Sequence, residues 1–300
     1  MTVSSELIAA IANLHLVART IVSSGTMGIH AGSRHGTSTE FLEHRAYFPG
    51  DEIKHIDWRA YAKTQRLHIK RYEDETSLRV ILLVDASGSM GFASDKISKL
   101  GRASELAAAI AYLTLAQGDS VGLIAGQGTN ISNVPVARGV THLQTLLACL
   151  ASLEPTGKTD LIQLGQRALD LSRNKNTVTI MLSDLFDPNP SVFDELRLLA
   201  NKLGDLRILQ ILDPAEITFP FEQPSTFLSM ESDQKLFSHP RTIKAAYLKA
   251  MHTFLDKTQR VLHGAGVIFS RTETHEDPRH ALQRFISHQA SLPRRVIRNA

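Results

Sequence analysis

The chain has 300 residues, of which 43% are apolar and 21% are charged, which predicts a folded protein with a substantial core and excludes a disordered or fibrous chain. The formal net charge is +3 and acids and bases are interspersed, so the composition does not indicate a nucleic-acid partner. The single cysteine, Cys149, cannot form an intrachain disulfide, which fits a reducing compartment. Without a signal peptide or a run of about 18 apolar residues, the sequence predicts a cytoplasmic protein with no membrane span.

The first 77 residues differ in character from the rest of the chain. Apolar residues recur at helical spacing in residues 5–23, which predicts an amphipathic N-terminal helix. Residues 24–38 are rich in glycine and serine and indicate a loop. Residues 39–77 are dense in aromatic side chains and in charges of both signs, so this segment is expected to present a mixed-charge surface.

From residue 78 onward, short apolar runs alternate with segments of helical periodicity. The predicted strands are 78–85, 119–126, 134–137, 176–184, 206–212 and 266–274, and the predicted helices are 100–113, 141–153, 159–173, 191–203, 240–262 and 278–289. Strands separated by helices favour right-handed crossovers, so the fold class is α/β, a mainly parallel sheet with helices on both faces. This domain is expected to span residues 78–290, with an inserted hairpin at about 214–240 and a basic tail at 291–300.

Two of the strongest predicted strands end in an aspartate, Asp85 and Asp184. The carboxyl ends of parallel strands meet at one edge of an open α/β sheet, where ligands bind. Ser87 and Ser89 follow Asp85 at alternate positions in the stretch DASGS and are expected to lie beside it. Carboxylates, hydroxyls and waters suit a hard cation, Mg²⁺ in the first place and Mn²⁺ or Ca²⁺ as alternatives. In a purely structural interpretation, Asp85 caps the following helix and the serines are turn residues.

This pattern resembles the metal-ion-dependent adhesion site (MIDAS) of von Willebrand factor A domains. Asp85, Ser87 and Ser89 match the D-x-S-x-S of that site's first loop. Thr159 in TGKTDL matches the threonine of the second loop, and Asp184 in LSDLFD matches the aspartate of the third. The resemblance implies a von Willebrand factor A-like fold that binds a metal ion through these five residues. The ion would take a further carboxylate ligand from a partner protein.

The segment before the predicted domain is similar to the signature of a bacterial family, the domain of unknown function number fifty-eight (DUF58). In that family the phrase R-x-Y-x-P-G-D-x-x-x-x-I-D-W precedes the A-type domain. The residues that fit the phrase are Arg45, Tyr47, Pro49, Gly50, Asp51, Ile56, Asp57 and Trp58. The resemblance extends over about residues 27–290. It implies that the protein works with a MoxR-type AAA+ ATPase in the chaperone-like maturation of a protein complex.

The leading hypothesis is a non-enzymatic, Mg²⁺-dependent protein-interaction module with no catalytic residues. Two alternatives stay open: a metal-dependent phosphohydrolase that uses the same carboxylates, and a scaffold whose metal site is purely structural. Thr156 competes with Thr159 for the second-loop position. Residues 157–159 match the end of a nucleotide-binding P-loop, but Ser152 stands where that loop needs its first glycine, so a P-loop is disfavoured.

Overall fold

The computed structural model of the chain describes residues 15, 40–46, 58, 61, 65, 67–73, 78–172, 176–187, 189, 191–232 and 234–291. The predicted N-terminal helix lies outside these residues, except for His15, which is helical. The predicted loop at 24–38 and the basic tail, except for Ser291, also lie outside them. None of the described helices has the length and hydropathy needed to cross a membrane.

Contacts within the chain divide it into two units, His30–Ser77 and the remainder. In the smaller unit, β1 (Glu40–Ala46) pairs antiparallel with β2 (His68–Glu73). Two residues of the family phrase belong to the described part of this unit: Arg45 lies in β1, and the Trp58 side chain is 60% exposed. The other residues of the phrase lie outside the described residues.

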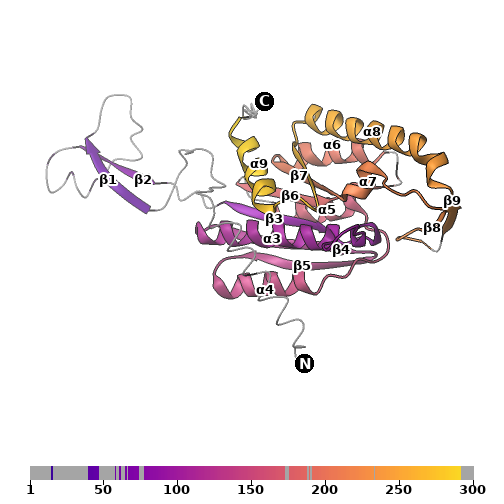
Figure 1. Cartoon of the computed structure of the whole chain (residues 1–300). Coiled ribbons are helices and arrows are strands. Elements are labelled where there is room, and N and C mark those ends of the chain that lie inside the picture. The colour runs from indigo at the N-terminus through magenta and orange to yellow at the C-terminus, as the bar shows by residue number, and fades with distance from the viewer. Residues whose placement is uncertain are drawn as a thin grey trace, which may run out of the picture. The chain divides into compact units, whose positions relative to one another are not determined.

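The larger unit is built on a six-stranded sheet (Figure 1). Its strands are β3 (Arg79–Asp85), β4 (Ser120–Gln127), β5 (Asn130–Ala137), β6 (Thr177–Ser183), β7 (Leu206–Leu212) and β10 (Ile268–Glu273). They lie in the order β10-β7-β6-β3-β4-β5, and every neighbouring pair is parallel except β4 with β5. Counted along the chain from β3, the order is 3-2-1-4-5-6, that of a doubly wound sheet. The predicted α/β fold with a mainly parallel sheet is confirmed.

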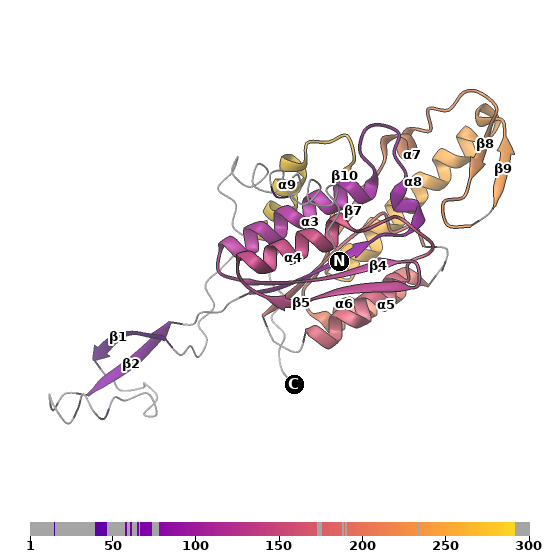
Figure 2. The same cartoon turned by 90° about the horizontal axis from the view of Figure 1, so that it is seen from below.

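Helices cover both faces of the sheet, as the crossover connections require (Figure 2). One face is covered by α3 (Lys99–Ala116), α4 (Val140–Ala151) and α9 (Pro278–Ser291). The other face is covered by α5 (Leu161–Leu171), α6 (Val192–Leu203) and α8 (Pro240–Gly264). Two short helices, η2 (Gly88–Gly91) and α7 (Pro214–Thr218), follow β3 and β7 at the carboxyl edge of the sheet.

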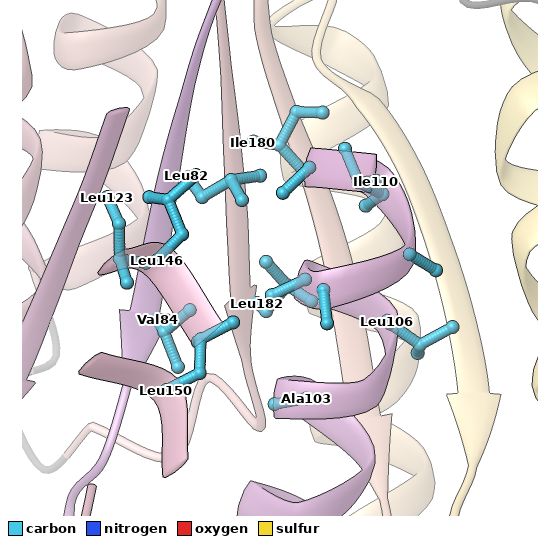
Figure 3. Packing of buried hydrophobic residues seen from close by; sticks show 14 of the residues in the cluster. Leu82, Val84, Ala103, Leu106, Ile110, Leu123, Leu146, Leu150, Ile180 and Leu182 are labelled. Atoms are coloured by element: carbon cyan, nitrogen blue, oxygen red, sulfur yellow. The ribbon is translucent and has the colours of Figure 1, made fainter. Parts of the chain in front are cut away.

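The central strand β3 is buried on both sides. Because successive side chains of a strand point to opposite faces, Val80, Leu82 and Val84 join one buried cluster, whereas Ile81 and Leu83 join the other. In Figure 3, Leu82 and Val84 lie among apolar side chains of α3 and α4. A strand covered on both faces needs a continuous apolar run, which is why the sequence signal for β3 is so strong.

Replacing Leu82 with alanine should lower the free energy of unfolding by about 2–5 kcal/mol, because its side chain is fully buried between β3 and the helices. Urea denaturation followed by circular dichroism measures this loss. The matched control is Leu198→Ala on α6, where the side chain is 57% exposed and the expected change is below about 0.5 kcal/mol. Equal losses for the two variants would contradict the placement of Leu82 in the core.

Between α7 and α8 the chain leaves the sheet and forms a hairpin. β8 (Ser225–Leu228) pairs antiparallel with β9 (Lys235–Ser238), within the interval where the sequence predicts an insertion. Phe227 of β8 stacks on Phe219 with ring centroids 5.8 Å apart, and it meets Phe221 edge-on at 5.6 Å. These aromatic contacts hold strand β8 against the segment that follows α7.

Candidate metal centre

Asp85 ends β3 and is buried at the carboxyl edge of the sheet. Its Oδ1 accepts a hydrogen bond from the backbone N–H of Ser87 at 2.9 Å, and its Oδ2 accepts one from the hydroxyl of Ser183 at 2.6 Å. Ser183 is the last residue of β6, the strand paired with β3. The Asp85 carboxylate is therefore fixed from two sides before any ligand binds.

Ser87 and Ser89 lie next to each other in the turn that leads from β3 into η2. Their hydroxyl oxygens are 3.1 Å apart. Two oxygen ligands at right angles on Mg²⁺, each about 2.1 Å from the ion, are separated by about 3 Å. The spacing of the two hydroxyls therefore fits neighbouring positions around one small ion.

Thr159 reaches the same edge from the loop before α5. Its hydroxyl donates to the carbonyl oxygen of Gly126 at 3.0 Å, and that oxygen also accepts the N–H of Ala86 at 2.8 Å. Gly126 is the register partner of Asp85 in the sheet, so the shared acceptor joins Thr159 to the first loop. A Cβ at position 126 would lie 2.5 Å from the Thr159 methyl group, which explains the glycine.

Backbone hydrogen bonds attach the second loop to the first. The N–H of Thr156 donates to the carbonyl of Ala86 at 3.0 Å, and the N–H of Gly88 donates to the carbonyl of Gly157 at 2.8 Å. Thr156 is exposed and meets the first loop through its backbone. Of the two candidate threonines, Thr159 is the one whose hydroxyl bonds to the strand beside Asp85.

Asp184 follows β6 and is fully buried. Its Oδ1 accepts the backbone N–H of Phe186 at 2.9 Å, and its Oδ2 accepts a hydrogen bond from Nζ of Lys99 at 2.7 Å. The side-chain amide of Gln210 donates to the Asp184 backbone carbonyl at 2.9 Å. The third loop is thereby fixed to both β7 and the start of α3.

Lys99 is the first residue of α3, and its side chain is fully buried. Its Nζ lies 2.7 Å from Oδ2 of Asp184 and 2.5 Å from Oε1 of Glu216 in α7. Burial alone would lower the pKa of Lys99, but the two carboxylates outweigh burial and raise it, so the side chain is an ammonium ion. Burial raises the pKa of Glu216, and the charge of Lys99 opposes that rise.

Asp85 has no such cation among its described hydrogen-bond partners, which are the hydroxyls of Ser183 and Ser87 and the backbone N–H of Ser87. Burial, and then the negative charge of Asp184, raise the pKa of Asp85 to about 6. A carboxylate that is buried beside another is stabilised by an opposite charge. Since Lys99 already faces Asp184 and Glu216, the edge carries surplus negative charge that a divalent cation would neutralise.

The structure thus places all five predicted ligands at one edge of the sheet, on three loops that are hydrogen-bonded to one another. Within the described part of the chain, no three His, Cys, Asp or Glu side chains are grouped as metal ligands. The donors at this edge are instead carboxylate and hydroxyl oxygens, which are the ligands that Mg²⁺ prefers. The residues present fit that ion.

A cleft with a volume of about 570 Å³ opens beside the hydroxyls. Its walls include Ser89, Lys158, Phe186, Glu216 and Glu231. Because Ser89 forms part of the wall, a ligand in this cleft would contact the candidate metal centre. A cleft of this size is large enough for a side chain of a partner protein and the residues next to it.

The chain is similar to known proteins over most of its length. The family model described as "Protein of unknown function DUF58" matches residues 43–253. The chain belongs to the DUF58 family. Among curated relatives, this DUF58 chain is 25% identical over 285 residues to "Uncharacterized protein Rv1480" of Mycobacterium tuberculosis (strain ATCC 25618 / H37Rv), an alignment that covers 94% of this chain and 89% of the relative.

Similar solved structures include BatB from Bacteroides thetaiotaomicron, with a TM-score of 0.48 and 15% identity over 71% of this DUF58 chain and 99% of that chain. They also include the SpRpn10 VWA domain, a von Willebrand factor A domain, with a TM-score of 0.42 and 11% identity over 69% of this chain and 94% of that chain. The predicted DUF58 family is confirmed by the family model.

Sequence reasoning missed three side chains that surround the two aspartates: Ser183, Lys99 and Glu216. Ser183 carries a readable signal, because it directly precedes Asp184 and ends the strand parallel to β3. Lys99 and Glu216 carry none, because they are distant in the chain and charged residues are ordinarily exposed. Their role depends on how α3 and α7 pack at the edge of the sheet.

Replacing Lys99 with methionine should lower the free energy of unfolding of the metal-free protein by about 3–5 kcal/mol. The change removes the ammonium that pairs with Asp184 and Glu216 and leaves both carboxylates buried without it. Urea denaturation in EDTA measures the loss, with Lys96→Met, an exposed position in the preceding loop, as the control. A Lys99→Met protein as stable as the control would contradict the buried ion pairs.

Proposed function

We propose that this DUF58 protein is a non-enzymatic, Mg²⁺-dependent protein-interaction module whose metal ion accepts a carboxylate from a partner. The observation that carries the proposal is the buried pair of Asp85 and Asp184. Lys99 donates to Asp184, whereas no cation is among the hydrogen-bond partners that the structure describes for Asp85. Uncompensated negative charge at a buried edge lined by hydroxyls favours a cation with oxygen ligands.

In this proposal the hydroxyls of Ser87, Ser89 and Thr159 bind the ion, whereas Asp85 and Asp184 supply charge and orient bound waters. Both carboxylates already accept hydrogen bonds on each oxygen, as an orienting group would. With mostly neutral oxygens around it, Mg²⁺ would retain much of its positive charge and would attract an external carboxylate. The cleft beside Ser89 offers a path for that carboxylate.

The proposed partner contributes an acidic side chain to the metal. As the family resemblance of the sequence implies, the proposed working partner is a MoxR-type AAA+ ATPase, in chaperone-like maturation of a complex. A phosphohydrolase would need a general base beside the metal in addition to the carboxylates. A purely structural metal would bind without any effect on partner capture.

Replacing Asp85 with asparagine should weaken Mg²⁺ binding by about 10- to 100-fold, because the carboxylate would no longer hold metal-bound water. The metal-free variant should unfold at a higher temperature than the wild type, since asparagine removes the charge whose burial, together with repulsion from Asp184, raises the pKa of Asp85. Isothermal titration calorimetry and thermal denaturation in EDTA measure the two opposite changes. Asp170→Asn, at an exposed position on α5, is the control and should alter neither. Unchanged Mg²⁺ affinity in Asp85→Asn would contradict the proposal.

Capture of a partner should depend on the metal. The wild-type protein, immobilised in Mg²⁺, should retain an acidic partner from a native lysate, and EDTA or the Asp85→Asn change should release it, because the partner's carboxylate binds the ion. Mass spectrometry identifies what is retained, with Asp170→Asn as the matched control. Equal retention in Mg²⁺ and EDTA would indicate a structural metal, and phosphatase turnover with Mg²⁺ or Mn²⁺ that is lost in Asp85→Asn would indicate the enzymatic alternative.

A further inference from the structure

The tip of the β8–β9 hairpin lies directly on the first metal-binding loop. A Cβ built at Gly88, between the two candidate serine ligands, would lie 1.9 Å from the carbonyl oxygen of Met230. A Cβ at Gly91 would lie 3.3 Å from the Met230 methyl carbon. Contact this close leaves no room for another group between hairpin and loop at these points, and it explains why glycine stands there.

The next residue of the hairpin, Glu231, directs its side chain to the same loop. Its Cγ would lie 3.4 Å from a Cβ at Gly88, and its carboxylate accepts hydrogen bonds from the hydroxyl and the backbone N–H of Ser89. Glu231 and Ser89 both line the cleft, with Lys158 on its wall. A carboxylate from within the chain therefore already contacts one of the candidate metal ligands.

Glu231 is half-buried, whereas Asp85 and Asp184 are buried, but the negative charge of Asp184 acts on Glu231 as it does on Asp85. Burial is the main cause that raises its pKa; the negative charge of Asp184 adds to it, while Ser89 and Lys158 act in the opposite direction. A third carboxylate is thus directed at an edge that already carries surplus negative charge. In the absence of a cation this arrangement is unfavourable, and a metal ion at the edge would make it favourable.

We infer that Glu231 is an internal ligand of this metal centre, which occupies the position that a partner's carboxylate would otherwise take. The inference rests on the proposed metal site and adds a regulatory element to it. With Glu231 in place, the metal has no position open toward the cleft. Binding of a partner then requires the hairpin tip to leave the loop, and the partner competes with Glu231 for the ion.

The rest of the hairpin is suited to such a displacement. The side chains of Leu228, Leu236 and Phe237 are 63%, 62% and 65% exposed, so few of their contacts would be lost if the tip moved. Phe227, one register pair from the turn, packs on Phe219 and Phe221. These contacts can hold the strands in place while the turn that carries Glu231 moves and Glu231 is exchanged for another carboxylate.

The test uses the full chain with Mn²⁺ as a probe for Mg²⁺, because water-proton relaxation reports how many water molecules the bound Mn²⁺ retains. Glu231→Gln should bind Mn²⁺ at least about tenfold more weakly than the wild type and should retain one more water on the ion. Added acetate should displace that water in Glu231→Gln and should have no effect in the wild type. Glu231→Ala should behave in the same way.

The control is Glu222→Gln, in the same inserted segment, where the exposed carboxylate pairs with Arg241 at 3.4 Å. It should match the wild type in Mn²⁺ affinity, water number and response to acetate. Equal water numbers in the wild type and both Glu231 variants would overturn the inference and leave the metal site in place. Failure of Mn²⁺ to bind the wild type would overturn the inference together with the proposed function.

Discussion

The mutual repulsion of Asp85 and Asp184 is the constraint that organises the carboxyl edge of this sheet. Asp85 ends β3 and Asp184 directly follows β6, and both side chains are buried, so water does not screen them from each other. Ser183 donates to one carboxylate and Lys99 to the other.

Lys99 offsets one part of this repulsion and ties three elements together in doing so. It begins α3, contacts Asp184 after β6 and reaches Glu216 in α7. Asp213, which directly follows β7, fixes the same region from the other side. It accepts the backbone N–H of Ser94 at 2.9 Å and caps α7 by accepting the N–H of Ala215. The edge is thus rigid on the β6–β7 side and carries its uncompensated charge near Asp85.

Strands with a continuous run of apolar residues could be predicted from the sequence. The prediction was less accurate where polar and apolar residues are mixed. β3 was predicted from its apolar run, but β5 was predicted as residues 134–137, whereas the strand covers Asn130–Ala137. The first half of β5 is polar because it forms the edge of the sheet and is largely exposed there. Asp85 and Asp184 were found because they interrupt apolar runs. Lys99 and Glu231 were not, because their positions depend on tertiary packing that leaves no periodic trace.

The double hydrogen bond at Gly126 has a consequence for the choice of residue at position 159. A hydroxyl that gives its proton to the Gly126 carbonyl keeps its lone pairs free, so Thr159 can bind an ion without breaking that bond. Its methyl group meanwhile fills the space that the missing side chain of Gly126 leaves. Serine would supply the hydroxyl oxygen but would leave this space empty, whereas valine would fill the space but has no hydroxyl oxygen. Threonine does both. The choice of ligand residue in the second loop therefore depends on the glycine in the neighbouring strand β4.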